Sequence, residues 1–299
     1  MKSNHASFRW RVANSIWFLI QHIFPAKVYL SLRYRVVFGH WINWSEPKKF
    51  SEKLQWLKLY GYGASESHLV DKLLVKDFVA ERIGEDFVLP TLGMWSKASE
   101  IAFANLPDEY VIKCNHDSGS VFLSKKHQPL NQTDVISVFE KELKTNYYWT
   151  GSETPYKYVT PKVFAEPLIK CSTEEGLMDY KFFCFNGEPK LFKIDFDRFT
   201  DHRANYYDVD GNLLPFGEIS CPPMYEKRLQ LPENLQEMLD VARSLSRGLP
   251  FARVDLYNIE GIIIFGEITL FPASGFGRFT DDHWDLRLGD WINLPSRSK

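Results

Sequence analysis

The 299-residue sequence predicts an α+β fold built mostly from antiparallel sheets. Apolar residues recur at helical spacing near the N-terminus, whereas short apolar runs separated by turns dominate from residue 109 onward. Two of these turns contain Asn186-Gly187 and Asp210-Gly211, dipeptides that favour tight β-hairpins. Because hairpins join antiparallel strands, the second half of the chain is expected to form antiparallel sheets.

The N-terminal part is predicted to be helical. Residues 50–60 have apolar side chains at helical spacing, and the Gly-rich stretch 61–65 ends that helix. A second helix is expected over 66–83, closed by Gly84 as its C-cap. Short strands are expected at 87–90 and 92–95.

Strands and two further helices fill the rest of the chain. The strands are expected at 110–113, 121–123, 162–169, 180–185, 190–194, 206–207, 252–257 and 262–268, and the helices at 133–148 and 232–246. We divide the chain into a helical segment (1–65), the start of the core (66–108), a lid (109–170) and a C-terminal subdomain (171–299).

Composition excludes several classes of function. A net charge of −2 argues against a nucleic-acid binder that works by phosphate neutralisation. None of the four cysteines forms a CxxC pair, which favours free thiols in a reducing, cytoplasmic compartment over a zinc site or a disulfide framework.

The N-terminus is basic. Residues 1–49 contain eight lysines and arginines against the single acid Glu46. The apolar run 16–20 is shorter than a secretory signal core or a membrane span. Two interpretations stay open: a helix packed on the protein's own body, or peripheral contact with the anionic inner face of a membrane.

Two stretches carry candidate chemistry. Lys113 ends a strand, and the small loop Ser118-Gly119-Ser120 follows it, so an ammonium and backbone N–H groups can surround a phosphate. A lysine in this context is also common as a solvated edge residue.

The second stretch lies near the C-terminus. Side chains alternate faces along a strand, so Arg253 shares a face with Asp255, and Glu267 shares one with Thr269. If these strands pair, the two carboxylates converge as hard oxygen ligands suited to Mg²⁺. The apolar run that leads into Glu267 argues against a merely solvated strand face.

The order of these stretches resembles the TupA-like group of the ATP-grasp superfamily over about residues 45–290. The matching segments are 50–58, Asp71-Lys72, 111–120, 179–187, 253–257 and 266–269. The resemblance implies two α+β subdomains that clamp ATP. The reaction it implies is activation of a carboxylate as an acylphosphate, followed by attack of an amine.

The resemblance also implies roles for individual residues. Lys72 and Lys113 contact phosphates beneath the flap Ser118-Gly119-Ser120. Glu166 and the backbone at Leu168 read adenine, and Asp179, with Lys181 nearby, meets the ribose. Arg253 steadies the transferring phosphate with Lys113 and Arg203 as further catalytic candidates, and Asp255, Glu267 and Thr269 hold Mg²⁺.

Two positions depart from the family pattern. Thr269 stands where an asparagine is frequent, which loosens one metal's coordination. Asp117 stands in place of a flap glycine and adds an acid near the triphosphate. Both motivate an alternative, a non-catalytic nucleotide-binding scaffold.

A glycosyltransferase is a further alternative, because Asp195-Phe196-Asp197 and Asp208-Val209-Asp210 are DxD motifs. The second motif falls in a hairpin turn, where aspartate is favoured for backbone reasons.

By resemblance, the substrates are expected to be an amino acid as amine donor and a uronic acid of a bacterial capsule or surface polysaccharide as acceptor. The candidates for anionic contacts are His116, Arg198, Arg203 and Arg278.

Overall fold

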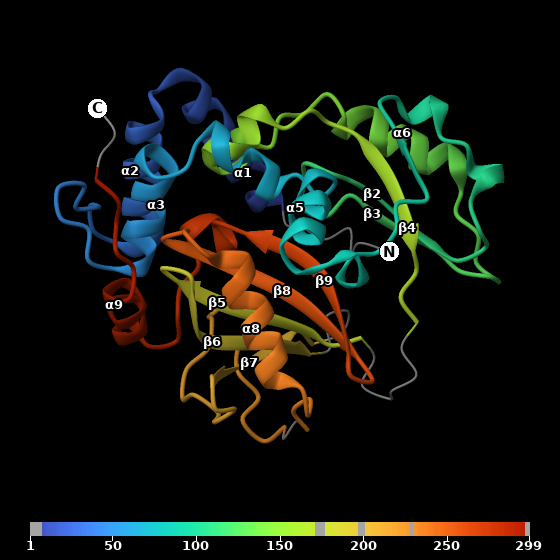
Figure 1. Cartoon of the computed structure of the whole chain (residues 1–299). Coiled ribbons are helices and arrows are strands. Elements are labelled where there is room, and N and C mark those ends of the chain that lie inside the picture. The colour runs from blue at the N-terminus through green and yellow to red at the C-terminus, as the bar shows by residue number, and fades with distance from the viewer. Residues whose placement is uncertain (1–7, 171–176, 197–200, 228–229, 297–299) are drawn as a thin grey trace.

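The computed structural model describes residues 8–170, 177–196, 201–227 and 230–296 (Figure 1). The helices are α1 (Phe8–Ile23), α2 (Ala26–Phe38), α3 (Phe50–Tyr60), α4 (Ser67–Val70), α5 (Leu74–Ile83), α6 (Gln132–Glu142), α7 (Tyr148–Gly151), α8 (Leu235–Ser246) and α9 (Asp282–Asp290). The strands are β1 (Gly93–Trp95), β2 (Tyr110–Cys114), β3 (Val121–Ser124), β4 (Val163–Pro167), β5 (Asp179–Phe185), β6 (Glu188–Phe196), β7 (Arg203–Asp208), β8 (Phe251–Ile259) and β9 (Ile262–Thr269).

These strands form two antiparallel sheets, which confirms the predicted α+β class. The smaller sheet has the order β1-β4-β2-β3 and packs its apolar face on α6 around Ile112, Cys114, Phe139 and Ala165. Cys114 is fully buried there, as expected for a packing residue. The sheet begins at β1, so it spans the predicted boundary at residue 108.

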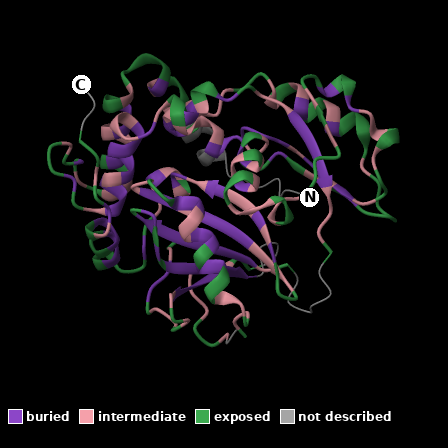
Figure 2. Cartoon of the chain, in the orientation of Figure 1, coloured by how far each residue is buried: buried purple, intermediate pink, exposed green. Residues whose placement is uncertain are grey.

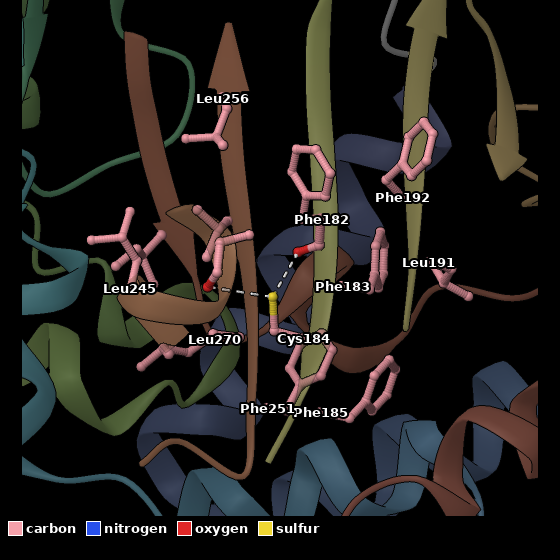
Figure 3. Close-up of a cluster of buried hydrophobic side chains, with 14 of the residues drawn as sticks. Phe182, Phe183, Cys184, Phe185, Leu191, Phe192, Leu245, Phe251, Leu256 and Leu270 are labelled. Carbon is pink, nitrogen blue, oxygen red and sulfur yellow. Dashed lines mark hydrogen bonds between the residues drawn. The ribbon is translucent and has the colours of Figure 1, made fainter. Parts of the chain in front are cut away.

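The larger sheet has the order β7-β6-β5-β8-β9. Helix α8 crosses β5, β6 and β8 on one face (Figure 1). On that face, Cys184 lies against the carbonyl oxygen of Ala242 in α8 (Figure 3). The central strands are buried, and the exposed residues gather in loops and on outer helix faces (Figure 2).

The opposite face of the larger sheet changes character along its strands. At one end Phe183, Phe185 and Phe251 pack among aromatic side chains, with Phe50 from α3 stacked edge-on to Phe251. At the other end the same face carries charged residues of β5, β6, β8 and β9. We call these two ends the aromatic half and the charged half of this face. The aromatic half packs on helix α3 through Phe50, and the charged half faces toward the smaller sheet.

The first hairpin prediction is confirmed at the backbone level, and at the second site the predicted turn forms but leads to a single bridge between Tyr207 and Leu213 and not to a paired strand. Asn186 and Gly187 both have positive φ angles, 52° and 84°, as the turn between β5 and β6 requires. Asp208 closes the following turn, because its Oδ1 accepts hydrogen bonds from the backbone of Asp210 and Asn212.

Several element predictions were wrong. The expected helix 66–83 is broken at Asp71, whose extended backbone ends α4 and whose Oδ1 accepts the Leu73 N–H ahead of α5. Residues 87–90 form no strand, and the expected helix 133–148 divides into α6 and α7. Helix α9, which the apolar pattern did not indicate, begins at Asp282 and is capped by the side chain of Asp281.

Candidate functional site

The β8–β9 pair brings the predicted carboxylates together. Asp255 lies directly opposite Glu267, and Arg253 lies opposite Thr269. The register shifts after Asp255, so that Gly266 is an extra residue between the pairs Leu256–Phe265 and Asp255–Glu267. This β-bulge reverses the alternation, because it leaves Phe265 in the core and turns Glu267 to the charged face.

Gly266 is required at the bulge by close backbone approach. A Cβ atom on this residue would lie 3.0 Å from the backbone oxygen of Asp255 and 3.3 Å from the Tyr257 ring. Simple alternation along an unbroken strand would place residues 265 and 267 on one face, so the glycine decides which side Glu267 occupies.

The Arg253 guanidinium binds the three predicted metal ligands at once. Its Nε and one terminal nitrogen donate to Asp255 Oδ1 and Oδ2 at 2.7 and 2.6 Å. The same nitrogen donates to Glu267 Oε1 at 3.0 Å and to Thr269 Oγ1 at 2.9 Å. Thr269 in turn donates to Glu267 Oε1 at 3.0 Å, so its hydroxyl belongs to the cluster.

Charged residues of β5 and β6 extend this cluster across the sheet. Lys181 is the strand neighbour of Asp255, and its Nζ lies 3.1 Å from Asp255 Oδ2 and also pairs with Asp179. On β6, Lys193 pairs with Asp195 at 3.2 Å and with Glu218 at 3.2 Å. Cations and carboxylates therefore alternate over most of the charged half.

The pKa values of the two paired carboxylates, Asp255 and Glu267, are shifted in opposite directions. Burial raises the pKa of Asp255 to about 6, against the pull of Arg253 and Lys181. Burial acts in the same direction on Glu267, but Lys72, Arg253 and Lys181 outweigh it and lower the pKa of this group to about 2. Glu267 is therefore the more firmly ionised partner of the pair.

A cavity of about 250 Å³ joins the cluster to the N-terminal part of the protein and the flap. Arg253, Glu267 and Thr269 line one side of it, and Lys72 and Ser118 line another. The Lys72 ammonium donates to the backbone oxygen of Asp117, and its backbone N–H donates to Asn115. The break in the predicted helix at 71–73 thus turns Lys72 toward the flap.

A separate set of charges lies on the smaller sheet. Glu166 accepts from Lys113 at 2.5 Å through one oxygen and from Lys76 at 2.6 Å through the other. Burial raises the pKa of Glu166, but the two ammonium groups outweigh this effect and hold the pKa below its usual range. Lys113 and Lys76 both lie over the Phe164 ring, at 5.2 and 5.4 Å.

The donor set at the end of β8 and β9 fits Mg²⁺. Asp255, Glu267 and Thr269 present carboxylate and hydroxyl oxygens, which a hard divalent cation prefers. Their convergence on one guanidinium shows that the oxygens point to a common centre able to hold a cation. Arg253 would then shift from Asp255 toward the cavity that it already lines.

Other predicted residues lie elsewhere. Arg203 pairs with Asp201 at the far edge of the larger sheet, with β5 and β6 between it and Arg253, so we remove it from the catalytic set. His116 is buried and lies 3.1 Å from the backbone oxygen of Glu142, which rules it out as an anion contact in the cleft. Arg278 is exposed outside the cavity lining.

The remaining predicted positions lie in the flap, after β4, or outside the described residues. Gly119 and Ser120 belong to the flap, and Gly119 has a φ of 115° that favours glycine. Leu168 follows β4 and donates its N–H to Glu109. Arg198 and Asp197 lie outside the described residues.

Sequence reasoning missed several cavity and cluster residues. Lys193 was missed, and Asp195 was considered only as part of a DxD motif, although the two lie two residues apart in an apolar run, the same signal that identified Arg253 and Asp255. Lys76 carried no such signal, because a lysine on an amphipathic helix normally faces solvent. Cavity residues from outside the strands were also missed, namely the buried Glu153 and the half-buried Tyr147 and Tyr156.

The chain is similar to one known protein family and to several solved structures. The model of the TupA-like ATP-grasp family matches residues 52–293. No curated protein matches the chain. Among solved structures, D-alanine–D-alanine ligase from Bacillus anthracis in complex with ATP is similar, with 17% identity, a TM-score of 0.40, and coverage of 69% of this chain and 55% of that one.

Two further solved structures are similar at comparable distance. D-alanine–D-alanine ligase from Helicobacter pylori shares 15% identity, covers 82% of this chain and 70% of its own, and has a TM-score of 0.41. The ATP-grasp ligase PsnB with minimal precursor, Mg and ADP shares 11% identity, covers 74% and 57%, and has a TM-score of 0.38. The chain thus spans little more than half of the Bacillus anthracis ligase.

Proposed function

Since the family match covers residues 52–293, the chain belongs to the TupA-like ATP-grasp family, and we propose that it is an ATP-dependent carboxylate–amine ligase. The ATP-grasp resemblance read from the sequence is confirmed by this match, and the α+β fold with it. The activity itself, its substrates and the residue roles are our proposal.

One observation carries the proposal. The cavity of about 250 Å³ collects Lys72 and Ser118 with Arg253, Glu267 and Thr269, from parts of the chain nearly 200 residues apart. Cationic and flap groups on one side suit a polyphosphate, and oxygen ligands on the other suit a divalent cation that neutralises it. No nucleophilic serine or cysteine is needed at such a site, because the work is positioning and neutralisation.

The proposed reaction has two steps. A substrate carboxylate oxygen attacks the γ-phosphorus of ATP, and the bond to ADP breaks, leaving an acylphosphate. An amine nitrogen then attacks the acyl carbon, inorganic phosphate leaves, and the nitrogen loses a proton as the amide forms. When bound at Asp255, Glu267 and Thr269, Mg²⁺ would supply charge neutralisation to the phosphates.

The chain's own groups take the remaining roles. Lys72 donates to a phosphate oxygen where it now donates to the flap carbonyl of Asp117. Arg253, which lines the cavity, would steady the transferred phosphoryl group. On the smaller sheet we assign Lys113 to the phosphates and its partner Glu166 to the adenine. On β5 of the larger sheet we assign Asp179, which pairs with Lys181, to the ribose.

We assign the substrates by class. The acceptor is a uronic acid of a bacterial capsule or surface polysaccharide, and the donor is an amino acid, both cytoplasmic precursors. The support is the family resemblance. In the cavity lining, Lys72 and Arg253 are the cations, and Asp117, Glu153 and Glu267 are the acids.

The test is coupled ADP release across a panel of amino acids with a uronic-acid acceptor. Glu267→Ala is expected to lower ADP release by about 10²–10³-fold and to abolish its Mg²⁺ dependence. Glu260→Ala, an exposed carboxylate on the turn of the same hairpin, is the matched control and should leave both unchanged. If Glu267→Ala behaves like the control, the assigned site is wrong.

A nucleotide-binding scaffold is a second candidate, favoured by one observation. The Arg253 guanidinium donates hydrogen bonds to Asp255, Glu267 and Thr269 together, and it therefore lies where a metal ion would bind. A scaffold would bind ATP without substrate-dependent ADP release. The glycosyltransferase alternative is disfavoured, because the family match is to an ATP-grasp family and Asp208 closes a hairpin turn.

A further inference from the structure

The first two helices and the segment after them expose an apolar surface that the proposed site does not use. We name it the N-terminal surface, and its exposed apolar residues are Ile16, Phe18, Leu19, Ile23, Phe24, Val28, Val36 and Trp41. Scattered exposed apolar residues are normal on a protein, but eight within 26 residues of sequence point to an interaction site.

Helix α1 is fixed with its apolar stripe outward. Gln21 is buried, and its side chain donates to the backbone oxygen of Tyr148 and to Ser152 Oγ, both at 2.9 Å. Ile16, Leu19 and Ile23 recur at the spacing of a single helix face, opposite Gln21, and are 51%, 58% and 71% exposed. The side of α1 that bears Gln21 therefore contacts the rest of the protein, and the side that bears Ile16, Leu19 and Ile23 faces away from it.

Helix α2 repeats this arrangement with cations added. Its inward face buries Tyr29, Leu30 and Tyr34. Its outer residues include Val36, which is 69% exposed, beside the exposed Arg35. Lys27 is exposed near the start of the helix, and Trp41 follows its end at 60% exposure. Large apolar groups next to exposed cations are typical of helices that lie in a membrane interface.

Charge selects an anionic partner and disfavours a second copy. The first 49 residues carry a net charge of +7, and the remaining residues therefore carry −9. A symmetric dimer through this surface would bring two positive segments together. An anionic surface would attract the N-terminal segment and repel the rest, which orients the molecule. Within the described part of the chain, no helix is suited to cross a bilayer, so contact would be peripheral.

We propose that the N-terminal surface docks the protein on an anionic lipid bilayer. The Ile16–Leu19–Ile23 stripe enters the interface between headgroups and acyl chains, and Lys27 and Arg35 pair with lipid phosphates. The proposal is independent of the ligase activity, because none of these residues lines the cavity.

The experiment is flotation of the full chain with phosphatidylcholine vesicles that contain phosphatidylglycerol, against phosphatidylcholine alone. The wild type is expected to float with the anionic vesicles only, and high salt should release it. Leu19→Ser/Ile23→Ser should weaken binding at least about tenfold, and Lys27→Gln/Arg35→Gln by a similar factor.

Ile262→Ser is the matched control, since Ile262 is 62% exposed on the β8–β9 hairpin and should not affect flotation. Thermal melting of every variant should stay close to that of the wild type. Absence of flotation, equal binding to neutral vesicles, or equal loss with Ile262→Ser would overturn the proposal. So would a wild-type dimer that Leu19→Ser/Ile23→Ser converts to a monomer without any vesicle binding.

Discussion

The two sheets carry buried charge of opposite balance. On the smaller sheet, the ammonium groups of Lys113 and Lys76 share the single carboxylate of Glu166. On the larger sheet, carboxylates outnumber cations: Asp179, Asp195, Asp255, Glu267 and the adjoining Glu218 surround Lys181, Lys193 and Arg253. An excess of cation suits phosphates, and an excess of carboxylate suits a metal ion, so each sheet lacks what a metal–nucleotide complex supplies.

Removing a carboxylate from the larger sheet is expected to have the largest effect on the charge balance of the two sheets. Asp255→Ala leaves the buried Arg253 without its bidentate partner and removes one of the carboxylates that pair with Lys181. We expect a loss of about 3–5 kcal/mol in the free energy of unfolding. Urea denaturation measures this loss. A cost below that of Glu166→Gln would contradict the idea that the larger sheet's charges are the more tightly interlocked.

Glu166→Gln tests the smaller sheet. We expect a loss of about 1–3 kcal/mol, because the Lys113 side chain is 21% exposed and can reach water. Inorganic tripolyphosphate should then raise the melting temperature of the variant more than that of the wild type, since two unpaired lysines would accept it. A smaller rise in the variant would show that Glu166 does not balance a phosphate site.

Gly266→Ala separates backbone geometry from charge. The added Cβ would press on the Asp255 backbone oxygen, so we expect a loss of about 1–3 kcal/mol and weaker Mg²⁺-dependent ADP release. Gly63→Ala is the matched control, because a Cβ there meets no atom within 4 Å. Equal melting temperatures for the two variants would mean that the bulge tolerates a side chain.

A pH dependence is expected at Lys58, which lies outside both sheets. This lysine is fully buried, donates to Gly151 and Ser274 oxygens at 2.7 Å, and burial lowers its pKa to about 7, against the attraction of Glu153. Between that value and the ordinary pKa of about 10.4, the unfolded chain binds a proton that the folded chain does not. Stability contributed by this site therefore rises with pH across the window.

The measurement compares the wild type with Lys58→Met at pH 7 and at pH 9. The wild type should gain relative to the variant as pH rises, by at most about 1.4 kcal/mol per pH unit. A difference between the two that stays constant with pH would show that Lys58 remains charged in the folded protein.

The sequence by itself determined the parts that depend on local pattern. Strand alternation placed Arg253 with Asp255, and the dipeptide at Asn186 and Gly187 set a hairpin, because φ > 0 is cheap for those residues. Ordered motifs also identified the family, and Lys72, Ser118, Glu267 and Thr269 do line one cavity.

Only the tertiary structure decided which distant groups meet. Lys76 of α5 reaches Glu166 on β4, and no spacing along a helix encodes that contact. Arg203 is separated from the cluster by strand order, which sequence pattern does not fix. Glu267 faces the site through a bulge set by the packing of Gly266 on Asp255, since alternation gives a side chain's face only while the register is unbroken.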